Sequence, residues 1–448
     1  MTSHVFRLSG VGVLGFVLCG MRGVAIAQTE DQVTVAGTAE RDAAAVTETE
    51  TGPSFLSGDW GGARSNLVEK GLTFDLQWTQ SAQGVVSGGV DTGWEYGGSV
   101  DLLASLDLGR MDVMEGGYLR VLVEGRYGQS VIGQAGTVLP VNTDLYFPLT
   151  DELDEDVLAI SELSYTQFLS SQFAVVLGKL QTLDGDPTEF ANGRGRSQFM
   201  NFSLVAPNLT GLAIPYSTLG AGIVVLPSDK VTVTSLIMNT TDSSTTSGFS
   251  DIGDGASWLT EVQFQYRLGK LPGGQNVGFA YAFDNDFLNY SRSGLTGSGL
   301  VVQNEDSTWT TYWRAWQYLM TLDDPPDVIA AGDGRLDVRG LGVFARLGVV
   351  DDDTNLVHWG GSIGIGGRGL IPTRDEDSFG FGFAYTEFNN QGLLSALLLE
   401  DEANGFEAYY NAALAPGVEL TGDIQFLEPV VQRVSHTIVA GVRLNLQF

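Results

Sequence analysis

The sequence predicts an all-β fold, a transmembrane antiparallel β-barrel of about sixteen strands with a short plug-like segment near its N-terminus. Three observations predict this fold: an export signal at the start, short segments that alternate apolar and polar residues, and no apolar run after residue 27 long enough for a membrane-spanning helix. Only helices and closed sheets satisfy every backbone hydrogen bond in lipid. A membrane protein without such a run must therefore be a barrel.

The C-terminal segment, residues 435–448, shows the alternation most clearly. One face of the extended chain carries its apolar residues, which are Ile438, Ala440, Val442, Leu444, Leu446 and Phe448. Arg443, Asn445 and Gln447 lie on the other face, because successive side chains of a β-strand point in opposite directions. An edge strand of a soluble sandwich would show the same pattern. The terminal Phe favours a membrane barrel, since it resembles the ending of bacterial outer-membrane strands, where it is an insertion signal for the barrel-assembly machinery.

Residues 1–27 have the composition of a secretory signal peptide. Arg7 supplies a positive charge, Val11–Leu18 is a short apolar stretch, and the A-I-A sequence at the end is a small-x-small cleavage site. The only cysteine, Cys19, lies in this segment, so we expect the exported protein to contain none. Outer-membrane barrels often lack cysteine, whereas soluble secreted domains often use disulfides.

The rest of the chain divides into a leader and a single barrel. Residues 28–54 are rich in Thr, Glu and Ala without apolar periodicity, and we expect a flexible periplasmic leader there. Residues 55–448 contain short alternating segments separated by clusters of Gly, Asp, Asn and Pro. The predicted strands begin near residues 72, 95, 117, 157, 173, 216, 230, 258, 275, 308, 336, 358, 379, 405, 418 and 436. Sixteen is an even number, as expected for a porin-sized barrel.

The composition limits the possible partners. The formal charge is −31, and removing Arg7 and Arg22 with the signal leaves 21 basic and 54 acidic residues, a charge of −33. This sign excludes nucleic-acid binding. We expect the lipid bilayer to surround the barrel, and the acidic loops either to bind lipopolysaccharide through divalent ions or to be ordinary solvated surface.

Several motifs follow one another in the order found in a known family. They are Gly58-Asp59-Trp60-Gly61-Gly62-x-Arg64, Val176–Leu180, Phe190-Ala191-Asn192, Gln198-Phe199-Met200-Asn201, Glu407–Tyr410, Gln425-Phe426 and Gly441–Leu444. Over residues 55–448 the chain resembles the carbohydrate-selective (OprB-like) porins, although residues 240–330 match only loosely. The resemblance implies a sixteen-stranded bacterial outer-membrane barrel through which sugars diffuse.

The N-terminal motif has two physical interpretations. Asp59 and Arg64 carry opposite charges five residues apart, so they could pair within a short amphipathic plug against the barrel mouth. Alternatively, Asp59 could accept hydrogen bonds from backbone N–H groups at the start of a helix. Neither arrangement is catalytic.

One strand, Thr308–Met320, carries the residue types that a sugar pore needs. Tyr312, Arg314, Trp316 and Tyr318 share one face, on which aromatic rings could stack on pyranoses beside a guanidinium. The same aromatic residues could instead form the interfacial girdle that surrounds a membrane barrel. Arg314 argues against lipid contact for this face.

The alternation also identifies candidate pore-lining charges. On residues 117–127, Arg120, Glu124 and Arg126 share a face opposite to apolar neighbours. The remaining candidates follow the same alternation, and they are Lys179, Glu261, Arg267, Arg346 and Arg443. A constriction lined by both charge signs suits neutral, hydroxyl-rich solutes. Some of these residues could instead form ion pairs that brace the wall across strands.

The sequence offers little for enzyme chemistry. It contains no nucleophile elbow, no zinc-spaced histidine pair and no phosphate-binding glycine loop, and only His358 and His436 follow the signal. The acidic run at 351–355 lacks the Gly and Glu of a calcium loop, so a solvated turn is favoured. We therefore predict no catalytic residue, cofactor or metal.

The predicted function is passive, weakly selective diffusion of mono- and disaccharides across the outer membrane. A general size-sieving pore and a non-transport barrel, such as an adhesin or a structural anchor, remain as alternatives. A homo-oligomer is possible, and the sequence does not choose between a monomer and a trimer.

Overall fold

The computed structural model describes most of the barrel region. It describes residues 55–150, 154–183, 188–206, 213–296, 299–325, 336, 338–389, 400–432, 434 and 436–448, and the backbone of 25–29 and 32–36. The backbone segments form a small antiparallel pair, β1 (Ala25–Thr29) and β2 (Gln32–Ala36). The other residues of the predicted signal peptide and leader lie outside the described residues, and both segments stay predictions.

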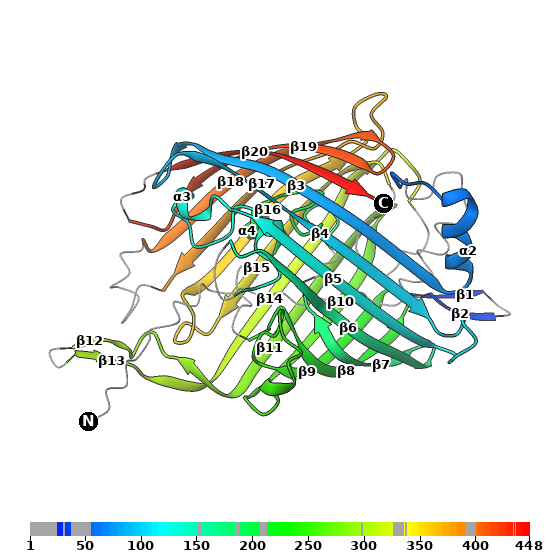
Figure 1. Cartoon of the computed structure of the whole chain (residues 1–448), viewed down its shortest axis with the longest axis horizontal. Helices are drawn as coiled ribbons and strands as arrows, with labels where there is room; N and C mark the ends of the chain where they lie inside the picture. Colours follow the sequence, from blue (N-terminus) through cyan, green and yellow to red (C-terminus); the bar gives the residue numbers. More distant parts are fainter. Residues whose placement is uncertain are drawn as a thin grey trace.

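Sixteen antiparallel strands form one closed barrel (Figure 1). They are β3 (Leu72–Gly88), β4 (Gly93–Asp107), β5 (Gly117–Gly128), β6 (Val157–Ser170), β7 (Phe173–Gln181), β8 (Ser217–Ser228), β9 (Val231–Asn239), β10 (Ala256–Leu268), β11 (Leu271–Leu288), β14 (Asn304–Thr321), β15 (Gly340–Val350), β16 (Val357–Arg368), β17 (Ser378–Phe388), β18 (Glu402–Ala415), β19 (Val418–Glu428) and β20 (Thr437–Gln447). The predicted fold is confirmed, and no barrel strand begins more than four residues from its expected start.

The closing strand shows why the sequence alternates. On β20, Arg443 and Asn445 point inward and are buried, whereas Val442 is exposed on the outer face. Strand β20 pairs with β3, with Leu444 opposite Gln80, and this pairing closes the ring. Closure leaves no strand edge unpaired, which is the condition for a sheet in lipid.

The two ends of the barrel differ. At one end, which we call the turn end, connections as short as residues 171–172, 229–230 and 269–270 join the strands. At the other, the loop end, long connections occur, and one of them carries a separate hairpin of β12 (Gly294–Thr296) and β13 (Gly299–Val301). A short helix, η3 (Phe249–Asp251), lies in another. No helix among the residues that the structure describes is long and apolar enough to cross a membrane.

Two connections from the loop end fold into the barrel. The first, residues 129–150, contains α3 (Ile132–Ala135) and η2 (Thr143–Leu145), and the second, residues 188–206, contains α4 (Phe202–Val205). Figure 1 shows α4 within the outline of the barrel. The two connections are joined by backbone hydrogen bonds and pack with inward strand residues into an apolar core inside the barrel. The lumen is therefore partly filled by the protein itself.

The N-terminal motif lies at the turn end, in η1 (Trp60–Gly62) and α2 (Ala63–Glu69). Asp59 accepts hydrogen bonds from the backbone N–H and hydroxyl of Ser65, so it stabilises the start of α2. The Arg64 guanidinium forms its ion pair with a residue other than Asp59. It contacts Asp75 at 3.1 Å and lies over the rings of Phe55, Trp60 and Phe74. The helix-start interpretation of Asp59 is therefore correct.

Candidate functional site: a loop that crosses the lumen

The connection 188–206, which we call the crossing loop, contacts opposite sides of the barrel. Its residue Arg194 contacts Glu124 on β5, and its residue Ala191 accepts a hydrogen bond from Arg346 on β15. Strands β5 and β15 lie eight positions apart in the ring of sixteen. The crossing loop therefore spans the lumen, and it determines how much of the lumen remains open.

A tight turn in the crossing loop presents two guanidinium groups. Gly193, Arg194 and Gly195 all have positive φ angles, of 84°, 54° and 80°. The backbone N–H of Arg196 donates to the carbonyl of Gly193 at 2.8 Å and closes the turn. Glycine adopts this left-handed conformation without steric cost. We call residues 193–196 the arginine turn.

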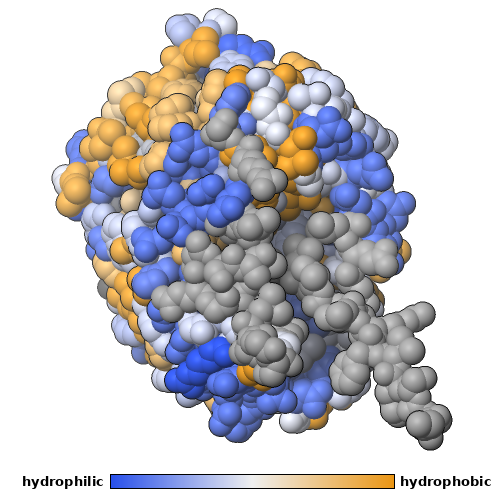
Figure 2. Space-filling view, turned by 90° about the vertical axis from the view of Figure 1, so that its left-hand side faces the viewer, coloured by the Kyte–Doolittle hydropathy of each residue, from blue (hydrophilic) through white to orange (hydrophobic). Residues whose placement is uncertain are grey.

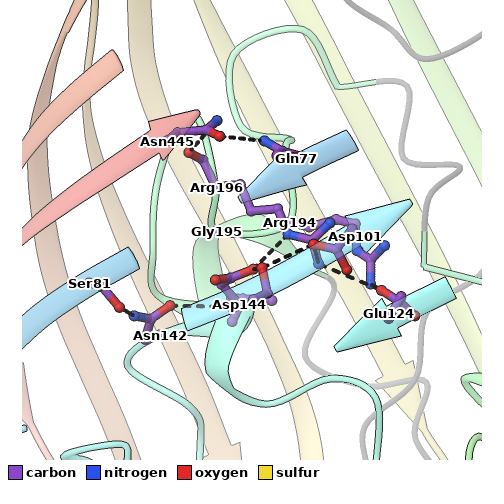
Figure 3. Close-up of polar contacts among 12 residues, drawn as sticks. Gln77, Ser81, Asp101, Glu124, Asn142, Asp144, Arg194, Gly195, Arg196 and Asn445 are labelled. Atoms are coloured by element: carbon purple, nitrogen blue, oxygen red, sulfur yellow. Dashed lines mark hydrogen bonds and ion pairs between the residues drawn. The ribbon is translucent and has the colours of Figure 1, made fainter. Parts of the chain in front are cut away.

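Arg196 is surrounded by three carboxylates (Figure 3). Its Nε atom donates to Asp144 Oδ1 at 2.6 Å, and its Nη2 atom lies 3.0 Å from Asp101 Oδ2 and 3.6 Å from Glu124 Oε1. Burial lowers the pKa of Arg196, but Asp101, Asp144 and Glu124 raise it, and the net pKa lies above the usual arginine value. The guanidinium therefore remains charged and is held by an excess of negative charge.

Arg194 extends this network toward the lumen. Its guanidinium donates to Glu124, which also accepts a hydrogen bond from the Tyr216 hydroxyl. The Glu124 side chain is only 1% exposed, whereas the Arg194 side chain keeps 11% of its surface exposed. Of this pair, Arg194 is thus the group that solvent reaches.

Amide and hydroxyl side chains hold the charged network in place by hydrogen bonds on both sides of the arginine turn. Asn142 donates to the Ser81 hydroxyl at 3.1 Å and accepts from the backbone N–H of Asp144. On the other side, Gln77 donates to Asn445, whose amide contacts the Arg196 carbonyl at 3.4 Å. Figure 3 shows these residues on both sides of the arginine turn. Their hydrogen bonds link it to the barrel wall.

Four of the cations predicted to line the pore hold loop carbonyls. Arg126 donates to the Tyr146 carbonyl at 2.7 Å, and Lys179 donates to the Thr246 carbonyl at 2.8 Å. The others hold the crossing loop: Arg346 donates to the carbonyls of Ala191 and Leu204, and Arg443 to those of Gly195 and Gln198. All four point inward and are buried. In this structure they anchor loops, and a contact with solute stays a prediction.

Arg120 lies nearer to open solvent than these anchors. Its Nε atom donates to Glu162 on β6 at 2.8 Å, and the two side chains are 15% and 11% exposed. We call Asp101, Arg120, Glu124 and Glu162, which lie on β4 to β6, the charged wall. Arg120 and Glu162 extend this wall beyond the buried network around Arg196.

The aromatic face of β14 points inward, as one of the two interpretations predicted. Tyr312, Arg314 and Trp316 are buried, and Trp313 on the opposite face is exposed. The Tyr312 hydroxyl donates to Glu261 at 2.7 Å, and Arg314 lies 3.9 Å from the same carboxylate. The girdle interpretation is therefore wrong for this face.

Arg267 is separate from the other candidates. It lies near the turn end of β10, and its Nη1 atom donates to the carbonyl of Lys270 in the adjoining turn. The structure thus brings Glu124 together with the arginine turn and pairs Arg120 with Glu162. It places Glu261, Tyr312 and Arg314 in a second buried cluster, whereas Trp316 packs with Tyr318 in the apolar core around Phe190 and Phe199.

The sequence analysis missed Arg194, Arg196, Asp101 and Asp144. Strand alternation does not apply to a loop, so it could not find the arginine turn or Asp144. Asp101 was detectable, because it shares a face of β4 with Ser99 and Ser105, all of them buried and inward. The G-R-G-R sequence between two family motifs was the remaining signal.

Comparison with known proteins agrees with this architecture. Residues 91–448 match the model of the family described as "Carbohydrate-selective porin, OprB family". The chain belongs to this family. It is 25% identical to Porin B of Pseudomonas aeruginosa over 442 residues, which cover 88% of this chain and 91% of that protein.

Solved structures show the same fold. The high-pH structure of Pseudomonas putida OprB matches with a TM-score of 0.75 and 19% identity, covering 90% of this chain and 100% of that one. Its low-pH structure matches with a TM-score of 0.54 and 17% identity, over 88% and 98%. The protein is thus an outer-membrane sugar porin and not an enzyme. In such barrels the short turns face the periplasm, so the loop end is extracellular.

Proposed function

We propose that mono- and disaccharides diffuse passively, and with weak selectivity, past the exposed side of the arginine turn and the Arg120–Glu162 pair of the charged wall. The observation that carries the proposal is the set of partly exposed groups of both signs, Arg120, Arg194 and Glu162. Guanidinium groups donate strong hydrogen bonds to hydroxyl oxygens, and carboxylates accept them. A sugar can therefore exchange part of its hydration for these contacts during passage.

The paired charges favour a neutral solute. Each guanidinium at the constriction already faces a carboxylate, so a bare ion of either sign gains little by displacing a partner. A hydroxyl-rich molecule can both donate and accept hydrogen bonds without separating the pairs. This supports weak selectivity for sugars over ions of similar size.

Liposome swelling is the most direct test of the proposed substrates. Vesicles that contain the purified protein should swell in glucose and more slowly in sucrose, and more slowly in amino acids than in sugars of equal size. Swelling that follows size alone would reduce the protein to a general pore. No swelling in any solute would favour a non-transport barrel.

A pair of substitutions tests the location of the constriction. Arg120→Ala should raise single-channel ion conductance and weaken the block of current by glucose, because a partly exposed side chain is removed. Arg314→Ala removes a guanidinium that is only 1% exposed and serves as the matched control. If Arg314→Ala changes the glucose block and Arg120→Ala does not, the constriction lies beside β14.

Further partners are also proposed. Figure 2 shows the loop end, where hydrophilic residues cover much of the visible surface and apolar residues lie along one side of the wall. This supports contact with lipopolysaccharide through divalent ions, which EDTA should weaken.

The backbone N–H of Phe448 donates to the Leu76 carbonyl, so deleting Phe448 should impair assembly by the barrel-assembly machinery. Chemical cross-linking in membranes would show whether copies associate.

A further inference from the structure

Five glycines form a smooth patch on the inner wall of β15, β16 and β17. Gly342, Gly366 and Gly380 are direct partners across the three strands, and Gly364 pairs with Gly382 in the next row. On β17 the residues that alternate with Gly380 and Gly382 belong to the opposite face, and they are Phe379, Phe381 and Phe383. We call the five glycines the glycine floor.

Apolar side chains of the crossing loop occupy the space that the floor leaves. A Cβ atom on Gly366 would lie 2.9 Å from Phe190 Cβ, and one on Gly380 would lie 2.7 Å from Phe199 Cζ. A Cβ atom on Gly382 would lie 2.7 Å from Leu204 Cδ2. Real Cβ atoms do not approach heavy atoms this closely, so the loop fits the wall only because these positions lack side chains.

Aromatic residues border the floor and hold the same loop residues. Phe190 packs edge-on against Tyr318, with ring centroids 4.8 Å apart. Phe199 packs edge-on against Tyr409 at 4.9 Å and lies 5.5 Å from Phe344. These distances are typical of favourable aromatic pairs. The floor and its border thus form two sockets, one for Phe190 and one for Phe199.

The two sockets bracket the arginine turn. Phe190 precedes residues 193–196 and Phe199 follows them, and both rings are buried. Hydrogen bonds fix the backbone next to each socket: Arg346 donates to the Ala191 carbonyl, and Glu407 accepts from the backbone N–H groups of Met200 and Asn201. A shift at either socket must therefore move the arginine turn.

We propose that the glycine floor positions the arginine turn and thereby sets the width of the pore, with Gly366 and Gly382 as positioning residues. This inference rests on the proposed function, because it assigns the constriction to the arginine turn. The contacts on opposite walls support it: the loop is seated on β15–β17, and the guanidiniums meet the carboxylates of β4 and β5.

The test adds a methyl group to the glycine floor and then shortens the loop side chain that faces it. In Gly382→Ala the three atoms nearest to the new methyl group belong to the side chains of Leu204 and Phe199, so these side chains can give way before the strand does. We expect single-channel ion conductance to change by roughly two-fold and glucose block to weaken, because sites tolerate only small misplacements. Adding Leu204→Ala makes room for the methyl group and should restore conductance toward the wild-type value.

Gly422→Ala is the matched control. Gly422 lies on the outer face of β19, where an added methyl group would have no atom within 4 Å, so this variant should behave as wild type. Gel mobility before and after heating checks that every barrel is folded. If Gly382→Ala fails to fold, Gly366→Ala tests the other socket on its own, because its methyl group would meet Phe190 Cβ and should likewise change the conductance.

The outcomes separate the inference from the proposed function. Folded Gly382→Ala and Gly366→Ala could conduct like the wild type while liposomes swell normally in sugars. That result overturns the positioning role of the glycine floor and leaves the porin function intact. A changed conductance that the second substitution does not restore also overturns it, because a socket predicts rescue. If the second substitution restores ion conductance but the protein passes no sugar, the positioning role of the glycine floor is supported and the proposed diffusion of sugars is overturned.

Discussion

The charged wall and the glycine floor hold the same loop by opposite means. On β4 and β5, Asp101 and Glu124 hold Arg196 through ion pairs at 3.0 and 3.6 Å. On β15 to β17, glycines leave space that Phe190 and Phe199 fill. The first contact depends on matched charges and the second on matched shapes.

The difference indicates which contact is specific and which is stabilising. Buried ion pairs gain little net free energy, because removing each charge from water offsets most of the attraction. Packed aromatic side chains contribute through buried apolar area and close contact. We infer that the floor stabilises the position of the crossing loop, whereas the charged wall determines which groups face the solute.

The largest expected effect comes from removing the central cation. Arg196→Ala leaves Asp101, Asp144 and Glu124 with one fewer buried partner, and breaking a buried pair in this way costs about 3–5 kcal/mol. The crossing loop should detach from the charged wall, so that single-channel conductance rises and current noise increases. Planar-bilayer recording measures both quantities.

Arg196→Lys separates charge from shape at the same position. The ammonium keeps the charge, but it cannot reproduce the planar guanidinium contacts with Asp101 and Asp144. An intermediate conductance is expected. If the Ala variant conducts like wild type, the glycine floor alone holds the loop, and the ion pairs of the charged wall do not contribute to its position.

The next effect concerns the hydrogen bonds beside the floor. Glu407 is buried and accepts from the backbone N–H groups of Met200 and Asn201, the latter at 2.9 Å. Glu407→Gln keeps the shape but turns one acceptor oxygen into an NH₂ group, which leaves a buried N–H without its acceptor at a cost of about 1–3 kcal/mol. Faster protease cleavage of the crossing loop should follow.

Glu428→Gln is the control for this prediction. Glu428 accepts from Asn404 at the exposed loop end of β19, where water can replace the lost contact. Its protease cleavage should match that of the wild type. Equal cleavage in the two variants would show that Glu407 does not fasten the loop.

The sequence revealed the barrel better than the loop inside it. Strand alternation correctly placed Arg120, Glu124 and Arg443 on inward faces, because the period of two is a property of every strand. It could not show that Arg443 binds loop carbonyls, since those partners lie about 250 residues earlier in the chain. Contacts between distant segments leave no local periodicity.

The glycine floor had a sequence signal of a different kind. Residues 378–384 read S-F-G-F-G-F-A, so glycine occupies the inward positions where a water-filled lumen usually has polar side chains. Inward glycine indicates that another part of the protein fills the space. The identity of the filling residues, Phe190 and Phe199, still required the structure.

The smallest expected effect concerns a solvent-exposed ion pair, which can be compared with the buried ion pairs of the charged wall. At the turn end, Arg339 donates to Asp323 from its side chain, at 2.7 Å, and from its backbone N–H, at 2.9 Å. Both side chains are 35% exposed. The hydrogen bonds from Arg339 lower the pKa of Asp323 below its usual value.

A lowered pKa in the folded state fixes the sign of the pH dependence. The pair stabilises the turn above the usual aspartate pKa of about 4, and this contribution is lost as the pH falls through the lower, folded-state pKa. NMR titration of the Asp323 carboxyl should show the low value, and Arg339→Ala should return it toward 4. Because water screens exposed pairs, pore conductance should be the same in the variant and the wild type. A conductance change as large as that of Arg196→Ala would show that burial does not distinguish the two networks.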